Sequence, residues 1–309
     1  MAVYISGSLA HDRIMVYPGL FADSILPEKV HMINVSFLIE SVRETRGGTA
    51  GNIAYSMALL GEKPLILSSA GKDFDEYAVF LNNLGLSVEG VRIINNEHTA
   101  FCYITTDLSD NQIVGFCPAA MNHPCEYNFG ELDLERDLAI VSPGNMDDMQ
   151  SLPRFYREKG LRYIYDPSQQ VAAFSGQQLL DGLTGSYILM CNDYELEVIM
   201  RNTKCGKADL AKRAKYIITT LGDKGCLLTT ATDEVHLPAL PVKAKDPTGA
   251  GDALRGGLLC GLHSGRDMLT ALQMGVTAAS FCVEANGTQE HFFDQNSFGA
   301  RYQKAFGEI

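Results

Sequence analysis

The sequence predicts an α/β protein with a doubly wound, mainly parallel sheet and a smaller β-rich segment attached to it. Two observations support this fold class. From residue 64 onward, short apolar strand candidates alternate with helix-like stretches, which is the pattern of a parallel sheet with helices on its faces. The strands are also almost continuously apolar, as in Ile188-Leu189-Met190, and strands of that kind are covered on both sides.

The first strand candidate spans 2–6 and leads through Gly7 and Ser8 to Asp12. Polar side chains just beyond the carboxyl end of a parallel strand lie where α/β sheets bind ligands. Taken alone, however, Asp12 is explained better as a turn or capping residue.

Residues 13–46 and 99–117 differ from the rest of the chain. Both combine imperfect period-two apolar patterns with turn residues, so they predict short strands and loops without helix. In the second segment, the turn-rich stretch 107–111 separates strand candidates at 101–105 and 112–116, which predicts a hairpin. We expect the two segments to form one small sheet.

Between these segments, Gly47 and Gly48 precede a helix whose apolar residues recur at helical spacing and which ends at Gly61. Two adjacent glycines let a ligand approach the backbone closely. Asn52, in the first turn, both donates and accepts hydrogen bonds. The alternative is a glycine hinge followed by a solvent-facing asparagine.

The remaining chain predicts the elements of the large sheet. One helix, after the candidate N-cap Asp267, is long and largely apolar and is expected to lie under the sheet. Strands are predicted at 64–68, 138–142, 163–166, 187–192, 216–221 and 225–229, and helices at 73–84, 149–159 and 268–283.

Two polar motifs follow strands in this region. Magnesium favours one or two carboxylates together with water and phosphate oxygens, and Glu195, with Asn192 ordering a water molecule, meets that need. A helix cap with acids in the first turn explains the same residues. The run 219–225, which includes Thr220, Gly222 and Gly225, is a strand–turn–strand unit and is a weak signal by itself.

The run 245–257 is the most informative stretch. Gly249, Ala250 and Gly251 form a tight turn that leads directly into a helix, with Asp252 at its start. Backbone N–H groups at such a helix start bind anions. A carboxylate beside an anion site is useful when it must take a proton from a hydroxyl group while the amides hold a phosphoryl group. The alternative is an ordinary helix start with an acid in its first turn.

The sequence Asp-Pro-Thr-Gly-Ala-Gly-Asp at 246–252, followed by Gly256 and Gly257, resembles the C-terminal signature of the ribokinase, or PfkB, family of sugar and nucleoside kinases. Further motifs at 7–12, 47–52 and 192–195 resemble the same family in the same order. Leu254 departs from the pattern, because the family usually has an aromatic residue there.

The resemblance implies a ribokinase-like fold and an ATP-dependent phosphotransferase. The expected large α/β domain comprises 1–11, 47–97 and 122–309, and a small β lid comprises 12–46 and 98–121. The implied catalytic residues are Asp252, as base, and Gly249, Ala250 and Gly251, as anion site. The implied substrate ligands are Asp12, Gly47, Gly48 and Asn52. The implied ATP contacts are Asn192, Thr220, Gly222, Gly225, Gly287 and Gln289; Mg²⁺ is assigned to Glu195 and, through water, Asn192. A monovalent cation such as K⁺ is a further expectation near 286–289.

The acceptor is expected to be a nucleoside, adenosine first and then inosine or guanosine. The segments 25–38, 46–48 and 104–108, with Asn111 and Gln112, look like those of a bacterial nucleoside-kinase branch with adenosine-kinase-like activity. Phe101 and Phe116 suit a flat purine. One alternative is phosphorylation of a free sugar such as ribose or fructose. Another is a nucleoside-binding sensor without turnover, although the intact Asp252 argues against it. Arg255 is assigned either to a phosphate or to the surface.

The composition excludes several function classes. A net charge of −12 and a pI of about 5.0 argue against nucleic acid and anionic membranes as partners. The eight cysteines include no Cys-x-x-Cys pair, which favours reduced thiols in a cytoplasmic protein. No signal peptide or bilayer-spanning run is predicted, and no P-loop or Gly-x-Gly-x-x-Gly motif is present. Exposed lid strands are expected to allow a homodimer.

Overall fold

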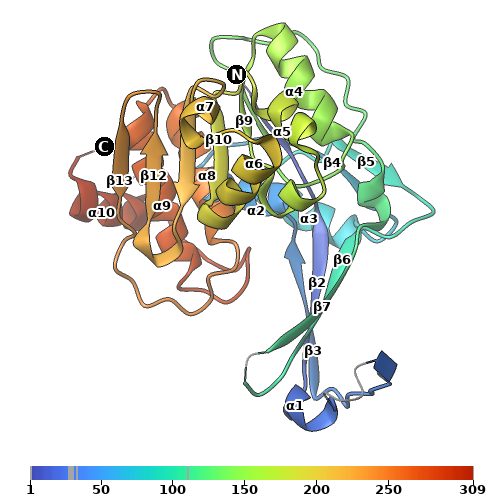
Figure 1. The fold of residues 1–309 in the computed structure, drawn as a ribbon. Coiled ribbons are helices and arrows are strands. Elements are labelled where there is room, and N and C mark those ends of the chain that lie inside the picture. The colour runs from blue at the N-terminus through green and yellow to red at the C-terminus, as the bar shows by residue number, and fades with distance from the viewer. Residues whose placement is uncertain (1, 27–30, 33, 110, 309) are drawn as a thin grey trace.

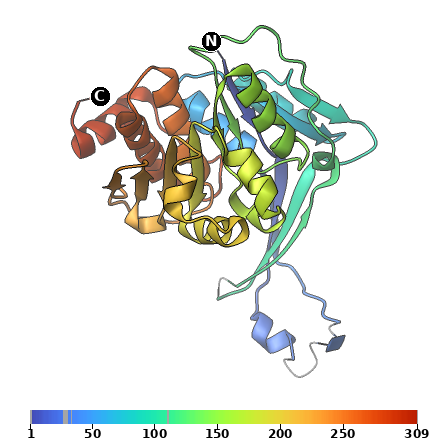
Figure 2. The same ribbon diagram turned by 45° about the horizontal axis from the view of Figure 1, so that its top comes forward.

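The computed structural model describes residues 2–26, 31–32, 34–109 and 111–308. Helices cover a large sheet, and a smaller sheet projects from one side of it (Figure 1). The projection is also clear in the tilted view of Figure 2.

Among the described residues, nine strands form the large sheet in the order β13-β12-β11-β10-β9-β8-β1-β4-β5. Every pair is parallel except β11–β12 and β12–β13, so the predicted mainly parallel sheet is confirmed. Two edge strands, β5 and β13, were not predicted, because each is only four residues long and is interrupted by charged or polar residues, Arg92 in β5 and Glu234 and His236 in β13. The bounds are β1 Val3–Ser6, β4 Leu65–Gly71, β5 Val91–Ile94, β8 Leu138–Val141, β9 Arg162–Tyr165, β10 Ile188–Asn192, β11 Tyr216–Thr220, β12 Cys226–Thr229 and β13 Glu234–Leu237.

The two faces of this sheet carry separate hydrophobic cores, as a doubly wound fold requires. Ile188 and Met190 of β10 pack into the core beneath α2, α3, α8, α9 and α10. Leu189 and Cys191 of the same strand pack into the core beneath α4, α5, α6 and α7. The helices are α2 Thr49–Leu59, α3 Asp75–Asn83, α4 Asp148–Lys159, α5 Gly176–Leu183, α6 Asp193–Thr203, α7 Lys207–Leu210, α8 Ala250–His263, α9 Met268–Cys282 and α10 Gln295–Phe306.

The small sheet combines the two β-rich segments, as predicted. Its strands are β2 Ala10–Val16, β3 Ser41–Gly47, β6 Ala100–Thr106 and β7 Gln112–Cys117, in the order β3-β2-β6-β7. Strands β6 and β7 form the predicted antiparallel hairpin. Within the predicted segments 13–46 and 107–111, residues 27–30, 33 and 110 lie outside the described residues.

The expectation that 13–46 contains no helix is wrong at α1 Phe21–Ser24. Phe21 is buried against the rings of Tyr17 and Phe37, and its backbone N–H donates to Asp107 Oδ2 at 3.0 Å. A single helical turn held by tertiary contacts leaves no helical period in the sequence.

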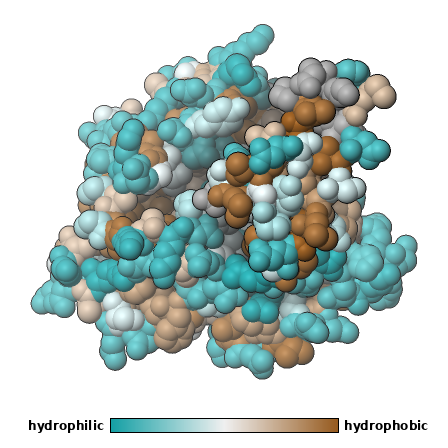
Figure 3. Space-filling model, turned by 90° about the horizontal axis from the view of Figure 1, so that it is seen from below, coloured by the Kyte–Doolittle hydropathy of each residue, from teal (hydrophilic) through white to brown (hydrophobic). Residues whose placement is uncertain are grey.

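The small sheet exposes several apolar side chains. Val42, Ile113, Val114 and Phe116 are each more than two-fifths exposed. Seen from below, the molecule shows apolar side chains on this projecting part and a hollow beside it (Figure 3). Within the described ranges, the helices lack the length and hydropathy that a membrane span requires.

Candidate active site

At the start of α8, two of the three backbone amides predicted to form an anion site are free to bind a ligand. Gly249 adopts a left-handed conformation with φ +79°, which brings the following backbone into the helix. In the described chain, the amides of Gly249 and Gly251 donate to no protein acceptor, whereas the amide of Ala250 donates to the Pro247 carbonyl at 3.1 Å. The expectation of three free amides is therefore wrong at Ala250, because that N–H closes the preceding turn; two remain free.

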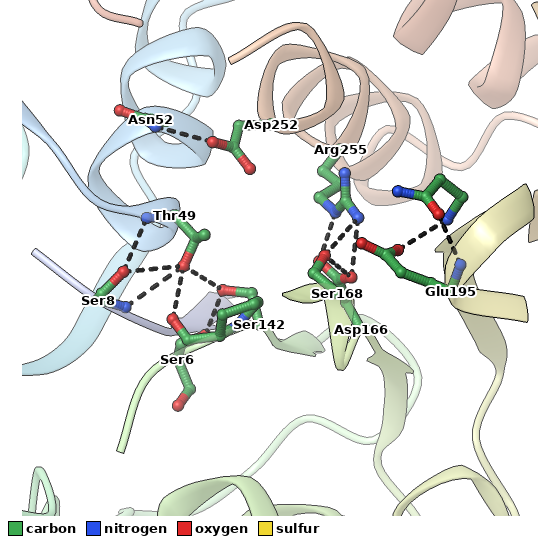
Figure 4. A network of polar contacts seen from close by, with 12 residues as sticks. Ser6, Ser8, Thr49, Asn52, Ser142, Asp166, Ser168, Glu195, Asp252 and Arg255 are labelled. Atoms are coloured by element: carbon green, nitrogen blue, oxygen red, sulfur yellow. Dashed lines mark hydrogen bonds and ion pairs between the residues drawn. The ribbon is translucent and has the colours of Figure 1, made fainter. Parts of the chain in front are cut away.

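Asp252 lies in the first turn of α8 and faces α2. Its Oδ2 accepts a hydrogen bond of 2.7 Å from Asn52 Nδ2 (Figure 4). Burial raises the pKa of Asp252 to about 6, against the opposing effects of Arg255 and of the Asn52 hydrogen bond. A carboxylate with this pKa is ionised at neutral pH and still has appreciable affinity for a proton, as a general base requires.

Close contacts explain why positions 47 and 48 are both glycine. A Cβ atom at Gly47 would lie 2.5 Å from Asp12 Oδ2, and one at Gly48, where φ is +90°, would lie 2.5 Å from the Ser8 carbonyl oxygen. The Asp12 carboxylate accepts no hydrogen bond from the described part of the chain, and burial raises its pKa to about 6. Asp12 is thus available to hydroxyl groups of a ligand.

Tyr77 shows that Asp12 and Asp252 belong to one site. Its hydroxyl is buried and donates to the Gly47 carbonyl at 2.9 Å. Gln289 Nε2 donates to the Tyr77 hydroxyl and to Asn52 Oδ1. Asn52 in turn donates to Asp252, and Gly47 lies against the Asp12 carboxylate. The structure therefore brings the first and last motifs of the chain together around this tyrosine.

A polar cluster fixes the start of α2 and thereby Asn52. The Thr49 backbone N–H donates to Ser8 Oγ at 3.0 Å, and Thr49 Oγ1 donates to the Pro143 carbonyl at 2.8 Å. Figure 4 shows this cluster where β1, α2 and the segment after β8 meet. It holds the first turn of α2 at the carboxyl ends of the parallel strands, where α/β sheets bind ligands.

The two phenylalanines expected at the nucleoside lie on opposite faces of the small sheet. Asp12 pairs with Cys102, which pairs with Phe116, whereas Phe101 pairs with His11 in the next row. Because side chains alternate along a strand, only Phe116 shares the face of Asp12. Phe101 instead contacts Tyr103 and lies near the Arg13 guanidinium, so its expected contact with the nucleoside is wrong for this arrangement.

A cavity of about 780 Å³ opens on the other side of α8. Most residues expected at ATP line it: Asn192, Glu195, Thr220, Gly222 and Gly225, together with Ala250 and Gly251. An apolar wall that was not predicted is formed by Ala239, Leu240, Pro241 and Val242, by Val276 and Ala279 of α9, and by Val283 at the C-cap of that helix. Positions 276, 279 and 283 recur every three or four residues, so their spacing could have indicated a common face.

Gly287 and Gln289 do not line this cavity. Gln289 is buried, and its Nε2 donates to Asn52 Oδ1 at 2.9 Å; the Gly287 amide donates to Asp246 Oδ2 at 2.9 Å. The expected ATP contacts of these residues are therefore wrong. The chain folds back beneath α2 here, where the Tyr55 hydroxyl donates to the His291 carbonyl at 2.5 Å, so Gln289 orients Asn52 instead.

Asn192 and Glu195 form the helix cap that was the alternative interpretation. Asn192 Oδ1 accepts from the Glu195 N–H at 2.7 Å, and Glu195 Oε2 accepts from the Asn192 N–H at 2.8 Å. Burial raises the pKa of Glu195. Glu195 lines the cavity, and the described residues contain no group of three or more His, Cys, Asp or Glu side chains that could hold a metal ion. This fits Mg²⁺ bound mainly by phosphate oxygens and water, with one carboxylate nearby.

Comparisons with known proteins agree with this arrangement. Residues 12–295 match the pfkB family of carbohydrate kinases. The chain is 31% identical to a nucleoside kinase of Methanocaldococcus jannaschii over 85% of its length and 87% of the relative's. A Burkholderia thailandensis nucleoside kinase in complex with inosine superimposes with a TM-score of 0.87 and 34% identity, covering 99% of this chain and 98% of that one. The same protein with ADP and inosine gives a TM-score of 0.85 and 35% identity, with coverages of 99% and 96%.

Proposed function

Because this chain belongs to the pfkB family of carbohydrate kinases and is thereby an ATP-dependent kinase of a hydroxyl group, we propose that its acceptor is the 5′-hydroxyl of a nucleoside, with adenosine as the first candidate. The observation that carries the proposal is the position of Asp252. Its carboxylate accepts a hydrogen bond from Asn52, which is connected through Gln289 and Tyr77 to the Gly47 carbonyl beside Asp12. Gly251, the preceding residue, lines the cavity.

The acceptor face of the small sheet supports a nucleoside over a free sugar. Asp12 on β2 and Phe116 on β7 lie in one row, two strands apart, which corresponds to about 10 Å. Asp12 accepts hydrogen bonds from sugar hydroxyls, and the half-exposed Phe116 ring packs against the base. A free sugar would use Asp12 and leave the exposed aromatic ring without a partner.

In the proposed reaction, ATP occupies the cavity with its base against the apolar wall and its phosphates at the start of α8. Asp252 accepts the proton of the attacking hydroxyl, a contribution of about 10²–10⁴ in rate. The free amides of Gly249 and Gly251 donate to the transferred phosphoryl group. Mg²⁺, when bound beside Glu195, neutralises charge on the phosphates. The small sheet, proposed as a lid over 12–46 and 98–121, keeps water from the phosphoryl group.

Three further expectations are part of the proposal. The first is that a monovalent cation such as K⁺ binds at 286–289, which is tested by measuring activity with and without that ion. A homodimer through the small sheet is supported by the exposed Val42 and Val114 on its edge strands and is tested by light scattering. A cytoplasmic location is supported by eight free cysteines.

The deciding experiment measures ADP release from ATP and Mg²⁺ with adenosine, inosine, guanosine, ribose, fructose or no acceptor. We expect turnover with adenosine well above that with either sugar. Preference for ribose or fructose would replace the nucleoside by a free sugar. Tight adenosine binding without any turnover would indicate a sensor.

A further inference from the structure

Arg255 is a buried residue of the nucleotide cavity and is fixed in one orientation. It lies on α8, is 6% exposed, and pairs with Asp166, which is 1% exposed. Arg255 Nη2 donates to Asp166 Oδ1 at 2.8 Å and to Ser168 Oγ at 3.1 Å, and Nε donates to Asp166 Oδ2. Figure 4 shows the guanidinium directed at these two residues. The alternative of a surface charge is therefore wrong.

The third guanidinium nitrogen remains free and lies beside the anion site. Nη1 donates to no group in the described chain, and a Cβ atom built on Gly251 would lie 2.7 Å from it. Residues 251 and 255 are one helical turn apart and share a face of α8, and both line the cavity. The free edge of Arg255 thus lies next to the free Gly251 amide.

Among the described residues that line the cavity, Arg255 is the one side chain that can act as counterion to a phosphate. It is the one cationic side chain among them, and Asp193, Glu195 and Asp223 are the acids. Without a counterion such a surface repels a triphosphate. The ion pair with Asp166 keeps Arg255 protonated despite burial, raising its pKa. A buried ion pair is weak evidence for a stabilising role, whereas a fixed guanidinium with one free edge is well suited to a phosphate oxygen.

We propose that Arg255 donates a hydrogen bond from Nη1 to the terminal phosphate of ATP and that Asp166 and Ser168 hold it in position for that contact. Arg255 and Gly251 then bind the same phosphoryl group from the nucleotide side, opposite Asp252. This inference rests on the proposed function and names a further phosphate-binding residue for it.

The experiment compares nucleotides that differ only in their phosphates. Arg255→Gln alone would leave Asp166 buried without a partner, so the main variant is the neutral pair Arg255→Gln/Asp166→Asn. Arg255→Lys keeps the charge and loses the fixed orientation. Arg92→Gln, which breaks the exposed ion pair with Glu126 away from the cavity, is the matched control. Thermal unfolding confirms folding, and calorimetry gives the affinities for AMP, ADP and ATP with Mg²⁺ and without acceptor.

We expect the neutral pair to lose about 10- to 100-fold in ATP affinity, as for a hydrogen bond to a charged group, with AMP affinity within about twofold of the wild type. The ATP affinity of Arg255→Lys should lie between those of the wild type and the neutral pair, and the ATP affinity of Arg92→Gln should match that of the wild type. An equal loss for AMP and ATP, or no loss for either in folded protein, would overturn the assignment. Because no acceptor is present, a wild type that fails to phosphorylate nucleosides would refute the proposed function and leave this comparison decisive.

Discussion

Lowering the pH should reduce activity in two separable ways, because burial raises the pKa values of Asp12 and Asp252 to about 6. In the free enzyme both groups must be ionised, Asp12 to accept hydrogen bonds from the sugar and Asp252 to accept the reacting proton. Each is about nine-tenths ionised at pH 7 and about one-tenth ionised at pH 5. Well below pH 6, kcat/KM for adenosine should therefore fall about 100-fold per pH unit.

The turnover number should respond less steeply. In the ternary complex, hydrogen bonds from the bound sugar favour the ionised form of Asp12, so kcat should fall only about tenfold per unit, through Asp252. Asn52→Ala removes the hydrogen bond that lowers the Asp252 pKa. A hydrogen bond to a partly solvated carboxylate accounts for roughly one pKa unit, so the acid limb of kcat should move up by about that amount.

The assay is the initial rate from about pH 4.5 to 8.5 with saturating ATP and varied adenosine. Asp12→Asn is the matched control, because it should reduce the kcat/KM slope to one proton and leave the acid limb of kcat in place. A wild-type acid limb near pH 4, or a kcat limb that Asn52→Ala does not move, would refute the assignment of these pKa values to the two carboxyl groups.

Four further predictions concern substitutions elsewhere in the site and in its supporting loops. Asp252→Asn should cut kcat by about 10²–10⁴ with adenosine binding retained, and near-normal turnover would contradict the base role. The same substitution should stabilise the ligand-free protein at pH 7 by up to about 3 kcal/mol in urea unfolding. The reason is that folding raises the pKa of Asp252 to about 6, so the wild-type protein loses stability as pH rises from about 4 to above 6. Gly48→Ala should cost at least about 1–3 kcal/mol of unfolding free energy, because φ is +90° there, whereas Gly115→Ala, in open space, should cost far less. Gln289→Leu should lower kcat without raising KM for ATP, since the Gln289 amide orients Asn52. A raised KM for ATP would show that Gln289 contacts the nucleotide after all. Phe116→Ala should raise KM for adenosine and Phe101→Ala should not, and the reverse result would show that the other face of the small sheet binds the base.

The sequence was sufficient for the parts of the fold that repeat a pattern. Near-continuous apolar strands predicted the large sheet, and Asp267 was correctly assigned as the N-cap of α9, where its carboxylate accepts from the amides of Leu269 and Thr270. The edge strands β5 and β13 and the single turn α1 escaped prediction, because short elements are defined by their neighbours more than by their own residues.

For the candidate site, too, local features were easier to predict than contacts between distant segments. Residues in local motifs, such as Asn52, Asp252 and Glu195, were assigned because those motifs resemble the ribokinase family, and a short motif also predicts the turn and helix start in which each residue lies. The register that separates Phe101 from Phe116, and the fold-back that carries Gln289 to Asn52, depend on pairing between distant segments. No local pattern records such pairing, since residue types specify a face and a turn but not the partner strand.

The start of α8 lies between the nucleotide cavity on one side and the proposed acceptor site on the other, and this separation has an evolutionary consequence. In the proposed function, phosphate binding uses residues between 166 and 255 that line or support the cavity, whereas recognition of the acceptor uses the small sheet formed by β2, β3, β6 and β7. Substitutions along β6 and β7 can therefore change which alcohol is accepted and leave the transfer chemistry untouched. A lineage with this architecture can exchange one metabolite for another by altering a peripheral hairpin.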